Sequence, residues 1–120
     1  MKTFLTAVLL LVSFNCFAFD EWSDADIKRE AVYQVLHVID WGQTRTIAKN
    51  PDKYYEYNSM IGKHPSVGRV DGYMATSALL HIGITHILPA EYRPAFQYVT
   101  IVFKSGLVAH NFQAGIQVSF

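Results

Sequence analysis

The sequence predicts an all-α protein, a three-helix bundle with a long ordered loop and a short extended C-terminal tail. Apolar residues recur at helical spacing in three segments, at about 24–48, 70–88 and 94–112. Pro51 and Pro89 follow the first two segments closely, and the residue before a proline is disfavoured in a helix. A chain of 120 residues has room for one domain core. These observations favour a single small bundle.

The first eighteen residues predict export. A basic residue precedes an apolar run over 4–14, and the small residues Cys16 and Ala18 follow it. This pattern is typical of a secretory signal peptide, residues 1–18, whose removal leaves 19–120 as a single helical domain in the periplasm or at the cell envelope. Two alternatives stay open. The segment is an uncleaved anchor, although its apolar run is shorter than the roughly 20 residues that span a bilayer, or Cys16 is lipidated.

The composition limits the classes of partner. Half of the residues are apolar, and ten basic residues balance ten acidic ones. Such a chain is not disordered, and it lacks the basic excess expected of a nucleic-acid-binding protein. A membrane surface or another envelope protein is the expected partner, no cofactor is expected, and the oligomeric state is left open. Cys16 is the only cysteine, so the mature chain cannot be held by disulfides despite the oxidising compartment.

The first helix has a clear start, and the loop after it is long. Ser23 followed by Asp26 resembles a capping box, in which the two side chains satisfy backbone N–H groups at a helix start, here at about Asp24. The connection over 51–69 is longer than an ordinary helix connection and contains prolines and glycines. Its three tyrosines favour an ordered loop over a disordered one.

The second and third segments are nearly free of charge. No fixed charge lies between Asp71 and Glu91, so this stretch fits either a buried helix or a minimal membrane span. Lys104 interrupts the otherwise apolar third segment. The final residues, 115–120, alternate apolar and polar side chains, which indicates a short extended tail. A soluble and a membrane-embedded bundle both remain open.

One face of the first helix is polar within apolar surroundings. Tyr33, His37, Asp40 and Thr44 share this face because they recur at helical spacing. In one interpretation the face is the wet side of an ordinary amphipathic helix. In the other it points into the bundle.

The other helices favour the second interpretation, because each carries its own isolated polar groups. These groups are Ser77, His81 and Thr85 in the second helix, and Thr100, Lys104, His110 and Asn111 in the third. A buried polar group left without a partner costs about 1–3 kcal/mol. We therefore expect an interhelical network in which Asp40 meets His81 or His110.

The same side chains suggest a metal site as the alternative. An aspartate with two histidines, Asp40 with His81 and His110, has the chemistry of a zinc site. The spacing matches no metal-binding signature, and no cysteine or nucleophile-elbow serine supports covalent catalysis. A structural network is therefore favoured over a metal or catalytic site.

Three short motifs carry a resemblance. DWGQT at 40–44, EYN at 56–58 and IGKHPS at 61–66, with His110-Asn111 near the end of the third helix, resemble a pattern in small uncharacterised exported or membrane proteins of Gram-negative bacteria and tailed phages. That group has no assigned activity. With the network expected above, the resemblance gives the candidate site residues: Asp40, Thr44, Glu56, Asn58, His81, His110 and Asn111.

Two functions follow as hypotheses. The first is a non-enzymatic envelope protein with an interaction or structural role, and, if it is phage-encoded, modulation of the host envelope. The second is a small membrane-associated metal-binding protein or hydrolase that uses Asp40, Glu56, His81 and His110, since ionisable residues in apolar helices are functional candidates. The first is favoured.

Overall fold

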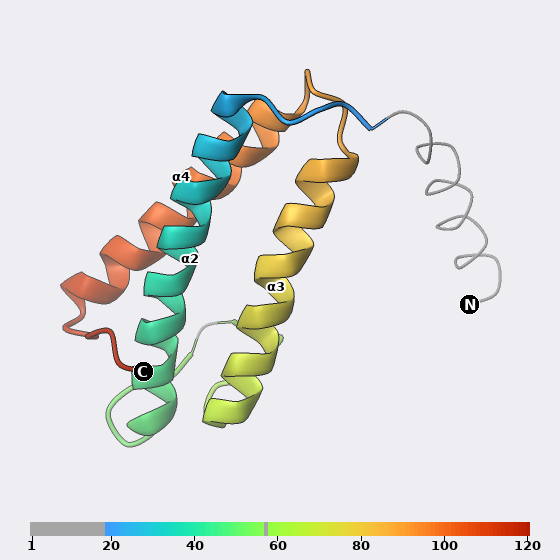
Figure 1. The fold of residues 1–120 in the computed structure, drawn as a ribbon. Coiled ribbons are helices and arrows are strands. Elements are labelled where there is room, and N and C mark those ends of the chain that lie inside the picture. The colour runs from blue at the N-terminus through green and yellow to red at the C-terminus, as the bar shows by residue number, and fades with distance from the viewer. Residues whose placement is uncertain (1–18, 57) are drawn as a thin grey trace, which may run out of the picture.

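The structure is a bundle of three helices. The computed structural model describes residues 19–56 and 58–120. Helix α2 covers Asp24–Lys49, α3 covers Val67–Ile87 and α4 covers Arg93–Gln113 (Figure 1). The predicted fold class is thus confirmed, and the described residues contain no β-strand. The predicted signal peptide lies outside the described residues.

The helix starts agree with local capping, with one correction. Ser23 and Asp26 form the predicted capping box at the start of α2. Helix α3, however, begins at Val67, three residues before the expected start. The cause is Ser66, whose hydroxyl accepts a hydrogen bond from the Arg69 backbone N–H at 3.1 Å. The loop between α2 and α3 is correspondingly shorter than expected.

Helix α2 forms the centre of the bundle. It packs against both α4 and α3, whereas α3 and α4 make few contacts with each other. The two outer helices come close at the short connection over 88–92 and diverge toward the loop end (Figure 1). This arrangement leaves room between α2, α4 and the loop.

The buried side of α2 is polar almost throughout. Its buried side chains follow one another at alternating spacings of four and three, which in most bundles is the spacing of an apolar seam. We call these residues the polar seam: Asp26, Glu30, Tyr33, His37, Asp40 and Thr44. Ile47 continues the same spacing with an apolar side chain. The polar face of Tyr33, His37, Asp40 and Thr44 therefore points into the bundle and is not the wet side of an amphipathic helix.

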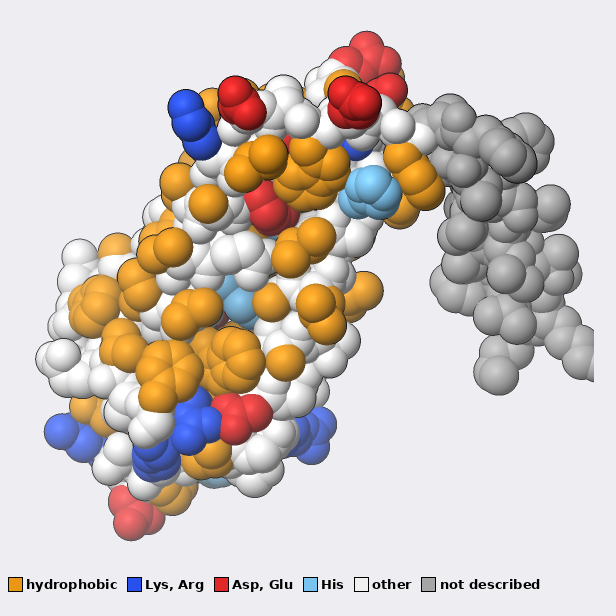
Figure 2. All heavy atoms as spheres, viewed as in Figure 1, with side chains coloured by type: hydrophobic (Ala, Val, Ile, Leu, Met, Phe, Trp, Pro, Cys, Tyr) orange, Lys and Arg blue, Asp and Glu red, His pale blue; other side chains and the backbone are white. Residues whose placement is uncertain are grey.

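The apolar side chains lie mostly outside. A small apolar core of Ile61, Val70 and Met74 sits at the loop end. Many large apolar residues are exposed on all three helices, and Figure 2 shows them covering much of the visible face. We call the helical ones the apolar outer surface: Ile27, Val32, Val35, Val38, Leu79, Leu80, Ile82, Ile84, Ile87, Tyr98, Val99, Val102, Phe103 and Phe112.

The C-terminal tail is extended, as the alternating pattern predicted, and the structure places it along α2. The Ser119 backbone N–H donates to the Gly42 carbonyl at 3.1 Å. A Cβ atom at Gly42 would overlap Val118 Cγ1 and stand 2.8 Å from Phe120 Cε2. The absence of a side chain at Gly42 is what allows the tail to approach this closely.

Within the described part of the chain, no helix combines the length and the apolar character needed to cross a membrane.

Candidate functional site

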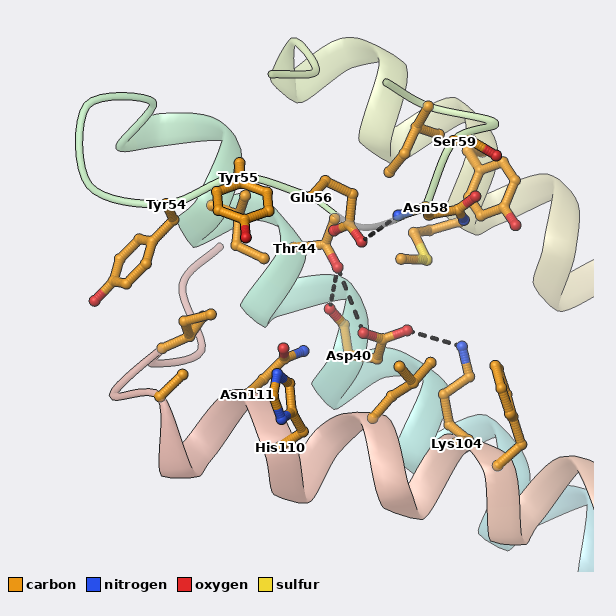
Figure 3. A pocket seen from close by; sticks show the side chains of 18 of the residues that line it. Asp40, Thr44, Tyr54, Tyr55, Glu56, Asn58, Ser59, Lys104, His110 and Asn111 are labelled. Atoms are coloured by element: carbon orange, nitrogen blue, oxygen red, sulfur yellow. Dashed lines mark hydrogen bonds and ion pairs between the residues drawn. The ribbon is translucent and has the colours of Figure 1, made fainter. Parts of the chain in front are cut away.

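A cavity of about 600 Å³ opens where α3 and α4 diverge (Figure 3). Its lining comes from α2, the loop after it, the first turns of α3, the second half of α4 and the tail. Six of the seven candidate residues line it: Asp40, Thr44, Glu56, Asn58, His110 and Asn111. The seventh, His81, belongs to a different network. The structure therefore brings together the residues of the DWGQT and EYN motifs with the His-Asn pair.

The floor of the cavity is a buried ion pair. Lys104 Nζ donates to Asp40 Oδ2 at 2.8 Å, and both side chains are largely buried. Thr44 Oγ1 donates to the Asp40 carbonyl at 2.8 Å, which fixes the hydroxyl beside the pair. Figure 3 shows the Asp40 and Lys104 side chains meeting across the gap between α2 and α4. Asp40 is paired, as expected, but the expected pairing with His81 is wrong because His81 binds Glu30.

The loop supplies a second carboxylate. Glu56 Oε1 accepts from the Asn58 backbone N–H at 3.0 Å, and Asn58 Oδ1 accepts from the Met60 backbone N–H at 3.0 Å. The two side chains thereby hold a tight turn in the loop. Figure 3 shows the Glu56 side chain reaching from the loop toward Thr44. Glu56 and Asn58 thus brace the loop through their own side chains, and Glu56 places a carboxylate at the cavity.

An amide clamp ties α4 to α2 beside the cavity. Asn111 Nδ2 donates to Gln43 Oε1 at 3.1 Å, and Gln43 Nε2 donates to the Val108 carbonyl at 3.2 Å. Gln43 is fully buried. His110, the residue before Asn111, is exposed on α4 and also lines the cavity.

A second polar network lies in the middle of the bundle. His81 Nδ1 is 2.6 Å from the Glu30 carboxylate, and His81 Nε2 is 2.7 Å from Thr100 Oγ1. Thr100 Oγ1 also lies 3.0 Å from the Phe96 and Gln97 carbonyls, which can accept its proton. The order Glu30, His81, Thr100 thus resembles a triad, but the threonine hydroxyl has carbonyl acceptors on its own helix that compete with the histidine for its proton.

The ring of His81 is also enclosed. The Tyr33 ring stacks on one side with centroids 3.5 Å apart, and the Phe96 ring lies on the other with centroids 4.7 Å apart. His37, one helical turn beyond Tyr33, is also buried. Its Nε2 contacts the Met74 carbonyl at 2.8 Å, and burial lowers the pKa of the ring. A neutral His37 therefore donates to that carbonyl, and both histidines serve packing.

A third network closes the end where the helices converge. The Arg93 guanidinium is fully buried; its Nε donates to the Thr85 carbonyl at 2.8 Å and its Nη1 to Asp26 Oδ2 at 3.2 Å. Burial opposes the charge of Asp26, but hydrogen bonds from Ser23 and Arg93 outweigh it and hold the pKa of Asp26 below its usual value. Gln97 Nε2 donates to the Asp26 carbonyl at 3.0 Å.

The metal alternative finds no support in the geometry. Among residues 19–56 and 58–120, no group of three or more His, Cys, Asp or Glu side chains is placed to hold a metal ion. The set Asp40, His81 and His110 does not converge, because His81 lies in the Glu30 network while the other two line the cavity.

Sequence reasoning missed the cationic partners. The pattern indicates Lys104 as an isolated polar group but does not indicate its partner, and it does not indicate Arg93 at all. Each of the two neutralises a carboxylate of the polar seam. A usable signal existed: Lys104 is the only fixed charge of the chain after Arg93. A lone charge in an apolar helix predicts an internal partner of opposite sign.

No protein-family model, curated protein or solved structure matches this chain. The resemblance based on the three motifs therefore stays a prediction.

Proposed function

We propose that the protein is an exported, non-enzymatic envelope module that associates with lipid through its apolar outer surface. The observation that carries the proposal is the reversed distribution of side chains. Charged and polar groups form most of the buried side chains, whereas many valines, leucines and isoleucines lie outside. In water such an exterior is unfavourable, since each square ångström of exposed apolar surface costs about 25 cal/mol. Contact with lipid removes that cost.

The distribution of charge supports lipid over a single protein partner. Three helical stretches, 31–44, 72–87 and 94–113, contain only two fixed charges, Asp40 and Lys104, and these neutralise each other inside. Figure 2 shows the visible acidic and basic side chains gathered toward the two ends of the bundle, with apolar side chains between them.

The number of helices involved supports the same partner. An interface with one protein normally forms a single patch. Here Val35 of α2, Leu79 of α3 and Val102 of α4 are each at least 60 % exposed, so the apolar outer surface is spread over all three helices. Lipid can contact several faces at once. Inward-facing ion pairs are also the arrangement that ionisable residues adopt in apolar surroundings.

The test is flotation with vesicles of phosphatidylcholine and phosphatidylglycerol. The protein is purified as the cell exports it, and its intact mass shows whether the chain begins at Phe19. We expect it to float with the vesicles, and the double variant Val99→Asp/Val102→Asp to float at least about tenfold less, because each aspartate costs more than 2 kcal/mol to place among lipid chains. Gln113→Asp, at the exposed end of the same helix, is the matched control.

The control variant should float like the natural protein, and circular dichroism should show unchanged helix content in both variants. Equal flotation of the natural protein and the double variant would overturn the proposal. A stable oligomer that forms without lipid and is lost in the double variant would also overturn it, in favour of a second copy of the chain as the partner.

A further inference from the structure

We infer that the cavity at the loop end binds an amphiphile with a zwitterionic headgroup, a phospholipid whose head carries a primary ammonium and a phosphate. The cavity has the size of small-molecule sites, which range over roughly 300–1,000 Å³. It lies where α2, the loop, α3, α4 and the tail meet, and its polar groups take no part in the Arg93 network at the other end of the bundle.

The first argument is the balance of charge. Four fixed charges line the cavity, the carboxylates of Asp40 and Glu56 and the ammonium groups of Lys53 and Lys104. Their formal sum is zero, with both signs present. A ligand with a single charge would face side chains of its own sign in a partly enclosed space. A zwitterion can place each of its charges against the opposite one.

The second argument is hydrogen-bond chemistry. Asp40 Oδ2 and Lys104 Nζ are joined at 2.8 Å. With respect to the residues that the structure describes, this leaves Oδ1 of the carboxylate and two N–H groups of the lysine for other partners. Thr44 Oγ1 approaches Oδ1 only weakly, at 3.4 Å. A primary ammonium can donate to Asp40, and phosphate oxygens can accept from Lys104. A quaternary ammonium has no N–H group and cannot make the first contact.

The third argument is the apolar wall. Beside these polar groups, large apolar side chains line much of the cavity: Ile47, Ile61, Met74, Phe103, Leu107 and Ile116. Phe103 also belongs to the apolar outer surface, so the wall is continuous with the surface proposed to contact lipid. An acyl chain attached to the headgroup can follow this wall out of the cavity.

The inference rests on the proposed function in one respect only, because contact with a membrane would supply the phospholipid. Binding to the cavity can therefore be tested without a membrane. The probe is dihexanoyl-phosphatidylethanolamine below its micelle concentration, measured by titration calorimetry and native mass spectrometry. We expect one lipid per chain. Dihexanoyl-phosphatidylcholine should bind about tenfold more weakly or less, since it loses one charged hydrogen bond. Phosphoethanolamine without acyl chains should also bind at least about tenfold more weakly.

Two variants separate the cavity from the outer surface. Leu107→Trp fills the cavity from its apolar wall and should reduce binding of the probe about tenfold or more, whereas Val99→Trp, on the outer side of the same helix, should leave it unchanged. Leu107→Trp should still float with vesicles, and Val99→Asp/Val102→Asp should still bind the probe. Failure of the inference and failure of the proposed function are therefore distinguishable.

Three results would overturn the inference. The first is equal binding of the phosphatidylethanolamine and phosphatidylcholine probes, which would exclude recognition of the primary ammonium. The second is unchanged binding in Leu107→Trp, which would place the lipid elsewhere. The third is free phosphoethanolamine binding as tightly as the lipid, which would exclude a role for the apolar wall.

Discussion

The two ends of the bundle pair their buried polar groups in different ways. At the closed end, where α3 and α4 converge, Arg93 and Gln97 fill the space between the helices and bind Asp26 and nearby carbonyls. At the cavity end, where the outer helices diverge, Asp40 and Lys104 meet, but the space around them is covered only by the loop and the tail. Both ends hold a buried ion pair, but the helices converge around Arg93 and Asp26 and diverge around Asp40 and Lys104. The divergence makes the second pair part of an accessible site.

The largest expected effect is at the closed end. Replacing Arg93 by methionine should lower the free energy of unfolding by about 3–5 kcal/mol, because it leaves Asp26 and several buried carbonyls short of a donor. Urea denaturation followed by circular dichroism measures the change. Arg69→Met is the matched control, since Arg69 is exposed, and it should shift the value by no more than about 0.5 kcal/mol.

Equal effects of Arg93→Met and Arg69→Met would show that the closed end does not depend on its buried guanidinium. The closed end could then no longer be described as a packed polar core that depends on Arg93.

A smaller effect is expected at the cavity end. Asp40→Ala should cost about 2–3 kcal/mol, because Lys104 loses its partner but can regain some hydration from the cavity. Thermal and urea melts measure the change, with Asp52→Ala in the exposed loop as control. The double variant Asp40→Ala/Lys104→Met should recover part of the loss, since no unpaired charge remains.

An Asp40→Ala melt that coincides with that of Asp52→Ala would place Asp40 in contact with solvent. It would also remove the ion pair from the floor of the cavity.

The smallest expected effect concerns the tail that covers the cavity end. Gly42→Ala forces Val118 and Phe120 to move and should cost about 1 kcal/mol net, although alanine favours the helix by about the same amount. At Gly106 of α4 an added Cβ meets nothing within 4 Å. Gly106→Ala should therefore stabilise the protein by up to about 1 kcal/mol.

Hydrogen exchange of the Ser119 amide locates the effect, because that N–H donates to the Gly42 carbonyl. Faster exchange is expected in Gly42→Ala and not in Gly106→Ala. Stabilisation by both alanines, with unchanged exchange, would contradict the close approach of tail and helix.

Local signals carried most of the fold prediction. The capping box at Ser23 and Asp26 and the prolines around the connections placed the helix ends within a few residues. The one larger difference is the start of α3 at Val67, three residues before the apolar pattern begins, because Ser66 caps the helix there. Period and capping are properties of neighbouring residues, so they can be recognised without tertiary contacts.

Six of the seven candidate residues line one cavity, but His81 does not, and the pairing of Asp40 was not predicted. Asp40, Thr44 and Asn111 do lie together, yet Asp40 meets Lys104 and His81 meets Glu30. Spacing along one helix shows which side chains share a face. It does not show which residue of another helix lies opposite, because that depends on the relative position and rotation of the two helices.

The sequence by itself thus determined three helices, their approximate ends, an extended tail and a polar face on α2. Only the tertiary structure decided that this face is the interior, that the apolar side chains lie outside, and that the outer helices diverge to leave a cavity. The physical reason is that hydrophobic periodicity marks two faces of a helix but not which of them is buried. Here ion pairs and hydrogen bonds between helices are satisfied only when the polar faces meet, and that requirement sets the inside of the bundle.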